Sequence, residues 1–182
     1  MDLAHHFLLA MPGLTGDYFA NSLTYICEHN DEGAMGVMIN RPSDLSLIEL
    51  FSQLSLQTDR KWVDTMVYEG GPVATERGLV LHSSDQQFES SADLGGGLCL
   101  STAMEVLDAI AHDRGPEQFL VAVGYAGWGA GQLEAEIANN IWLTTDADVD
   151  IVFHGVWEEK LKRAADLLGI DLNLIAARPG HA

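Results

Sequence analysis

Two strand-forming runs joined by a tight turn constrain the fold of this chain most strongly. Residues 22–29 (SLTYICEH) and 34–40 (AMGVMIN) are rich in strand-forming residues, and the turn Asn30-Asp31-Glu32-Gly33 lies between them. Glycine at the fourth turn position permits a positive φ, so the pattern predicts a β-hairpin. We expect this hairpin to end at Asn40-Arg41-Pro42, because proline cannot donate a ladder hydrogen bond.

The remaining pattern combines further strands with helices. Strands are expected at 4–11, 66–68, 78–82, 98–100, 119–125, 142–144 and 149–153. Helical spacing of apolar residues is found at 45–54, after Thr102 as far as Gly115, at 132–139 and at 157–168. Residues 83–97 read as a long loop. Strands dominate the first half and helices the second, which predicts an α+β fold in one domain over residues 1–182.

The charge balance argues against a nucleic-acid partner. The chain has 27 acidic and 9 basic side chains, a formal net charge of −18. Such a surface repels phosphate backbones and anionic membranes. The basic residues Lys160, Lys162 and Arg163 cluster, but on a predicted helix that also carries Glu158, so we interpret them as a solvated helix face.

The cysteines and the N-terminus indicate a cytoplasmic setting. Cys27 and Cys99 are too few for a disulfide framework. Cys27 is expected to be a buried thiol, with a Cys27–His29 dyad as the alternative. Asp2 replaces the basic start of an export signal, and no apolar run approaches the ~18 residues of a membrane span. No zinc or calcium motif occurs, so no metal or cofactor is expected.

Three segments together resemble a known family. They are FANSLTYICEHNDEGAMGVMINRP at 19–42, YEGGPVATERGLVLH at 68–82 and FLVAVGYAGWGAGQLEAEIANNIWL at 119–143. Their order and spacing are similar to those of the AlgH/YqgE family of small bacterial proteins. The resemblance implies an α+β fold with a bifurcated mixed β-sheet that includes a small closed barrel, flanked by helices. It implies no catalytic residues. One family line is named as a transcriptional regulator after a role in alginate control.

The first candidate site comprises Glu28, His29, Asn40 and Arg41. We expect the hairpin to place both pairs at the same open end of its two strands, so that a carboxylate, an imidazole, an amide and a guanidinium could converge. Such a group could bind a small anion or move a proton. The alternative is structural: the Asn40-Arg41-Pro42 side chains bond nearby backbone, and Arg41 pairs with Glu28.

Glycine-rich segments supply the other candidates. Gly70 and Gly71 let a chain or ligand approach the backbone closely, although a strand-end turn needs the same residues. His82, on the next strand, has two interpretations: it faces the same crevice, or it is a hydrogen-bonded strand end. Trp128 is expected in a Gly-rich turn, 127–131, that precedes a helix. This turn lacks the lysine of a phosphate-binding loop, so nucleotide binding is not favoured.

The sequence therefore predicts a non-enzymatic cytoplasmic protein that acts through an unknown protein partner, with any role in transcriptional regulation indirect. The alternative is a small-ligand-binding protein or enzyme that uses a polar crevice around Glu28, His29, Asn40, Arg41 and His82. Direct nucleic-acid binding is the third hypothesis, and the charge opposes it.

Overall fold

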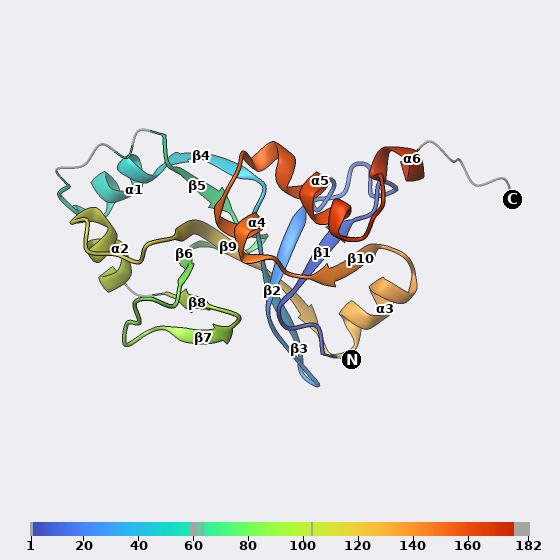
Figure 1. The fold of residues 1–182 in the computed structure, drawn as a ribbon. Helices are drawn as coiled ribbons and strands as arrows, with labels where there is room; N and C mark the ends of the chain where they lie inside the picture. The colour runs from blue at the N-terminus through green and yellow to red at the C-terminus, as the bar shows by residue number, and fades with distance from the viewer. Residues whose placement is uncertain (1, 59–61, 63, 103, 177–182) are drawn as a thin grey trace, which may run out of the picture.

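A computed structural model describes residues 2–58, 62, 64–102 and 104–176 (Figure 1). The strands are β1 (His6–Ala10), β2 (Leu23–Asn30), β3 (Gly33–Met38), β4 (Pro42–Ser46), β5 (Met66–Glu69), β6 (Val73–Ser83), β7 (Ala92–Gly95), β8 (Leu98–Ser101), β9 (Phe119–Gly129) and β10 (Trp142–Asp146). The helices are α1 (Leu47–Gln53), α2 (Met104–Ala111), α3 (Gln132–Ala138), α4 (Val149–Phe153), α5 (Trp157–Leu167) and α6 (Leu172–Ala176).

The long strand β9 is the point at which the sheet divides. Its last residues pair antiparallel with β3, while its first part pairs antiparallel with β6 and, on the other side, parallel with β5. The order across the sheet is β10-β1-β2-β3-β9-β6-β8-β7, with β4 joined to β5. The sheet is therefore mixed and bifurcated, and its antiparallel part curls into a half-barrel. The predicted α+β class with a bifurcated sheet and flanking helices is confirmed.

Strand alternation explains why both faces of this sheet are covered. Successive side chains of a strand point to opposite faces. In β1, Phe7 and Leu9 enter a core that α4 and α5 cover, whereas Leu8 enters a second core against α3. In β6, Leu81 belongs to the first core and Val80 to a third core under α1 and α2. Apolar strands buried on both faces thus position helices at both ends of the molecule (Figure 1).

The predicted hairpin is confirmed as β2 and β3, and it ends at Met38, just before Asn40-Arg41-Pro42. Pro42 then begins β4 at the first position of a strand, where its missing N–H costs least. Two other predictions are wrong. Gly127 and Gly129 lie inside β9 instead of in a turn. The segment 149–153, expected to be extended, forms α4, which Asp148 caps by accepting a hydrogen bond from the Asp150 amide.

The expected loop at 83–97 contains a strand. β7 pairs antiparallel with β8, so that the chain makes a second hairpin at this edge of the sheet. In Ala92-Asp93-Leu94-Gly95 the apolar alternation is limited to Ala92 and Leu94, and this four-residue strand is largely exposed, so its signal in the sequence is weak. Within the described part of the chain, no helix is long and apolar enough to cross a membrane.

Candidate functional site

The structure separates the four residues of the first predicted site. In the hairpin register His29 pairs with Ala34, next to the turn, whereas Thr24 pairs with Met38 at the opposite end. Asn40 lies beyond that end and contacts Leu23, six residues from His29. Six strand residues span about 20 Å. The prediction that both pairs meet at one end of the hairpin is therefore wrong, because 28–29 and 40–41 lie at opposite ends of these strands.

Asn40 and Arg41 are occupied by backbone groups. Asn40 Oδ1 accepts a 2.8 Å hydrogen bond from the Leu23 amide, and its Nδ2 donates to the Asn21 carbonyl at 2.9 Å. The Arg41 guanidinium donates to the carbonyls of Tyr18 and Ala20 and lies over the Tyr18 ring. Both side chains thus hold the segment before β2 against the strand end. Arg41 uses these contacts in place of the expected pairing with Glu28.

His29 links three elements at the turn end of the hairpin. Its Nδ1 accepts a 3.1 Å hydrogen bond from the Leu3 amide, so the other ring nitrogen, Nε2, carries the proton. Nε2 lies 2.8 Å from Glu134 Oε1 on α3. Hydrogen bonds from its own amide and from His29 lower the pKa of Glu134. With 5% of its side chain exposed, His29 holds the N-terminal segment and α3 to β2.

Glu28 and Trp128 border a shallow hollow near the turn of the hairpin. Glu28 accepts a 2.8 Å hydrogen bond from the Asn30 side chain and is exposed. The hollow between them is about 200 Å³ and is also lined by Glu32. Among the described residues, no Lys or Arg side chain lines this hollow, so it offers no cationic partner for the anion that the sequence suggested.

Trp128 is buried in an aromatic cluster. Its indole stacks on Phe19 and meets Trp142 edge to face. Glu136 on α3 accepts hydrogen bonds from the indole N–H groups of both Trp128 and Trp142, at 2.9 and 2.8 Å. These bonds satisfy two buried donors and fasten α3 to the sheet. Trp128 is therefore a packing residue of β9.

Gly70 and Gly71 allow two backbones to cross where the sheet divides. A Cβ at Gly70 would lie 2.2 Å from the Gly124 carbonyl oxygen, and one at Gly71 would lie 2.1 Å from the Tyr125 carbonyl carbon. The Gly70 amide donates to the Val123 carbonyl and its own carbonyl accepts from the Met38 amide, both at 2.8 Å. The groups that approach these two glycines closely are therefore backbone atoms of the same chain.

His82 is fully buried and belongs to a hydrogen-bond chain. Its Nδ1 donates to the Ser83 carbonyl at 2.9 Å, so Nε2 accepts from the Ser101 hydroxyl at 2.7 Å. Ser101 in turn lies 2.7 Å from Ser91, which accepts from the Phe88 amide. Because neither His82 nor Ser101 is exposed, this chain fastens the segment after β6 to β8. His82 does not join Glu28 or Arg41 in a common crevice.

Cys27 is a buried thiol, and the alternative of a Cys27–His29 dyad is not present. Burial, with the Glu28 carboxylate beside it, raises the pKa of Cys27 to about 12. Both ring nitrogens of His29 are used by Leu3 and Glu134. A thiol with so high a pKa is not a nucleophile at neutral pH.

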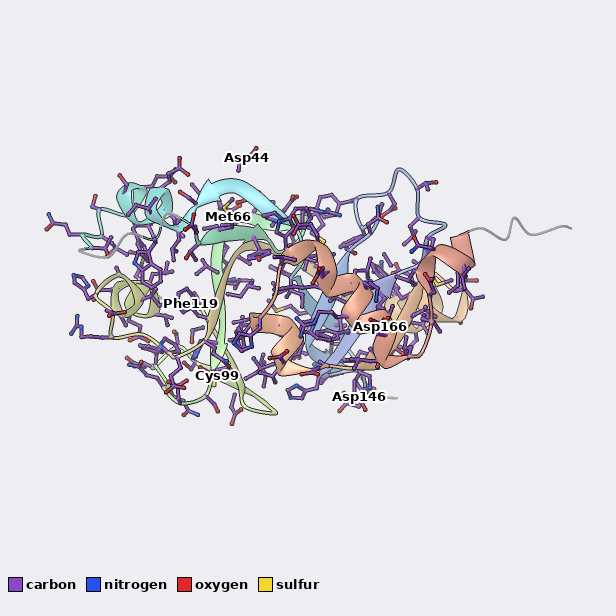
Figure 2. All side chains as sticks on the ribbon, turned by 45° about the horizontal axis from the view of Figure 1, so that its top comes forward. Asp44, Met66, Cys99, Phe119, Asp146 and Asp166 are labelled. Atoms are coloured by element: carbon purple, nitrogen blue, oxygen red, sulfur yellow. The ribbon has the colours of Figure 1, made fainter. Side chains whose placement is uncertain are left out.

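A cavity that the sequence did not indicate lies between the sheet and the last helices. It measures about 430 Å³, and the labelled Met66 and Phe119 mark its sheet side (Figure 2). β5 and β9 form one wall, and α4 and the start of α5 form the other. Its polar and charged lining residues are Asp64, Thr65, Tyr68, Glu158 and Lys160.

Lys160 is the buried charge of this cavity. Only 2% of the residue is exposed. Its Nζ donates a 2.7 Å hydrogen bond to the Val152 carbonyl and lies 5.1 Å from the centre of the Tyr68 ring. Burial, and secondarily the positive charge of Arg163, lower the pKa of Lys160 to about 8. The interpretation of Lys160 as part of a solvated helix face is therefore wrong.

The mouth of the cavity exposes two large apolar side chains. Val156 is 55% exposed and Trp157 is 40% exposed. The inward residue of this turn is Lys160, three positions after Trp157 on the helix. A lysine that follows two acidic residues on a helix is expected from sequence to be exposed. The contact of its long side chain with a carbonyl of another helix leaves no local signal.

Metal binding has no support in this cavity. Among the described residues, no group of three or more His, Cys, Asp or Glu side chains is arranged to hold an ion. The cavity instead combines an amine, an aromatic ring and two carboxylates at an opening to solvent. Such a site can bind a small organic group or a side chain of another protein.

Comparison with known proteins gives a consistent result across the chain. The model of a family described as AlgH-like matches residues 7–173. A UPF0301 protein of Thioalkalivibrio sulfidiphilus is 48% identical over 181 residues, covering 100% of this chain and 97% of that protein. A UPF0301 protein of Pseudomonas syringae pv. syringae is 50% identical over 182 residues, covering 99% and 96%.

Two solved structures share the fold. The solution structure of the AlgH protein from Pseudomonas aeruginosa is 48% identical, with a TM-score of 0.83, and the match covers 100% of this chain and 97% of that one. A crystal structure of a Corynebacterium diphtheriae protein is 19% identical with a TM-score of 0.74, covering 98% and 93%; this likeness concerns the fold alone. With a family model matched over most of its length and relatives near 50% identity, the chain belongs to the AlgH-like family.

Proposed function

We propose that this protein has no catalytic activity of its own and acts through a protein partner that docks at the mouth of the cavity between β5, β9, α4 and α5. The observation that supports this proposal is the exposure of Val156 and Trp157, adjacent residues at the opening of a cavity. Tryptophan residues that border a pocket are typical anchors of protein interfaces. In this proposal residues 1–182 act as one cytoplasmic domain.

The partner that fits this surface is a cationic segment of another protein. Asp64 and Glu158 line the same opening as Trp157, and Glu159 follows on the first turn of α5. A lysine or arginine of the partner would meet these carboxylates and the Trp157 ring, a cation–π pair. The net charge of −18 would speed the encounter with a basic partner and oppose one with nucleic acid. Any effect on transcription is then indirect, exerted through that partner.

The test uses a fluorescent nona-arginine peptide and anisotropy titrations at low and moderate salt. Wild type should bind at low salt. Trp157→Ala, which leaves the net charge unchanged, should weaken binding roughly two- to fivefold, the range of one exposed cation–π contact. Leu174→Ala is the matched control, because Leu174 is a 68% exposed apolar residue on α6, away from the cavity lining. Equal binding by the two variants would show that charge alone attracts the peptide, and would remove Trp157 from the interface.

A pull-down from native lysate then identifies the natural partner. Wild type, Trp157→Ala and Leu174→Ala are used as baits, and retained proteins are quantified by mass spectrometry. A specific partner should be retained by wild type and Leu174→Ala and depleted with Trp157→Ala. Retention of the same proteins by all three baits would contradict the proposed docking site.

A further inference from the structure

We propose that Lys160 is a carbonyl-binding site: its amine forms an imine with a small, uncharged aldehyde or ketone that enters the cavity. This inference goes beyond the proposed docking function and does not depend on it. It rests on the position of one amine within one cavity.

Lys160 is one of the residues that line the cavity, with 2% of the residue exposed. Its Nζ lies 2.7 Å from the Val152 carbonyl and 5.1 Å from the centre of the Tyr68 ring, and both of these residues line the cavity as well. A volume of about 430 Å³ accommodates a small organic molecule beside these residues.

The surroundings of Lys160 favour the neutral, nucleophilic amine. No ion pair recorded among the described residues involves Lys160, whereas Lys162 pairs with Asp166 at 2.8 Å. Burial of Lys160 lowers its pKa to about 8, so about a tenth of the amine is neutral at pH 7. The Asp166 carboxylate raises the pKa of Lys162. Desolvated lysines are the ones that serve as Schiff-base nucleophiles.

The reaction requires no oxidant or reductant. The neutral Lys160 nitrogen attacks the carbonyl carbon and forms a C–N bond, while the carbonyl π electrons move to oxygen, which takes up a proton. The carbinolamine then loses that hydroxyl as water with the remaining nitrogen proton, leaving a C=N bond. One water is released and no electrons are transferred. The Val152 carbonyl can accept one N–H of the amine without using its lone pair. Tyr68 lines the same cavity and keeps its proton, since burial raises its pKa.

The lining also selects the class of carbonyl compound. Asp64 and Glu158 are carboxylates at the same cavity, so a keto acid would meet two like charges. Met66, Phe119 and Val156 supply apolar surface. An uncharged aliphatic carbonyl compound therefore fits better than an anionic one.

The experiment measures reductive alkylation by propionaldehyde and sodium cyanoborohydride at pH 7, followed by peptide mapping. Lys61, Lys160 and Lys162 are the lysines of the chain, so each site can be quantified separately. Lys162 is the internal control, since its side chain is 77% exposed two residues away. Lys160 should be alkylated roughly tenfold faster or more, because its neutral fraction is far larger. Alkylation of Lys162 at an equal or higher rate would overturn the proposal.

Two further arms test the site itself. Lys162→Arg should retain the rapid alkylation by propionaldehyde, and Lys160→Arg should lose it. Rapid alkylation that survives in Lys160→Arg would assign the reaction to another residue. The rate at Lys160 should rise towards pH 8 and then level off. The charged or titratable groups around this amine are Asp64, Tyr68, Glu158 and Arg163, and the expected plateau follows from the pKa of about 8 of Lys160. Faster reaction with glyoxylate than with propionaldehyde would overturn the preference for uncharged carbonyl compounds.

Discussion

Lys160 is a buried ionisable residue, so it should make the free energy of unfolding depend on pH. The amine has a carbonyl and an aromatic ring as partners, and its pKa is about 8 in the folded state against an ordinary 10.5. Between these values the unfolded chain binds more protons than the folded one. The free energy of unfolding must therefore rise with pH in this window.

We predict that the free energy of unfolding of wild type, relative to Lys160→Met, increases by about 2 kcal/mol from pH 8 to pH 10. Urea unfolding at several pH values measures it. Subtracting the variant removes the other titrating groups, including the tyrosines, whose raised pKa values act in the opposite direction above pH 10. A difference that stays flat over this window would show that Lys160 is not desolvated in the folded state.

At the scale of elements, the link between β5 and β6 holds the divided sheet together. The Gly70 amide and carbonyl bridge β9 and β3, and a Cβ at Gly70 has no room beside the Gly124 carbonyl oxygen. The sequence predicted that these glycines allow close approach. Which backbone approaches them depends on the pairing of β3, β5 and β9, segments distant in the chain, and no local pattern contains that information.

Gly70→Ala should destabilise the protein by about 3 kcal/mol or more, because the backbones must separate or lose hydrogen bonds. Gly78→Ala is the matched control: this glycine also lies in a strand, β6, and an added Cβ meets no atom within 4 Å. Its effect should stay within about 0.5 kcal/mol of zero. Chemical denaturation of both variants gives the comparison, and a tolerated Gly70→Ala would refute the role of this crossing.

At the scale of the molecule, the distribution of charge determines which partners can approach. The exposed cations near α5 are already engaged: Lys162 pairs with Asp166, labelled in Figure 2, and Arg163 pairs with Asp150. Arg41 donates to backbone carbonyls. Phosphate binding would need several free Lys or Arg side chains on one face.

We therefore predict no measurable affinity for a duplex DNA at 150 mM NaCl, with a Kd above roughly 100 µM, the weak end of non-specific binding. Fluorescence anisotropy with a labelled duplex measures this. Tight binding that weakens steeply as salt is raised would show that the net charge of −18 does not decide the partner.

The sequence by itself determined the α+β class, the β2–β3 hairpin, the central strand β9 and the helices α1, α2, α3 and α5, because apolar periodicity and turn residues act locally. It also predicted the alternative role of Asn40 and Arg41 as backbone-bonding residues. Tertiary structure decided the rest. The hairpin register placed His29 and Asn40 far apart, and packing of α4 and α5 on β5 and β9 buried Lys160 beside Tyr68. Contacts between elements distant in the chain carry no local signal, so the candidate site emerged only from the folded structure.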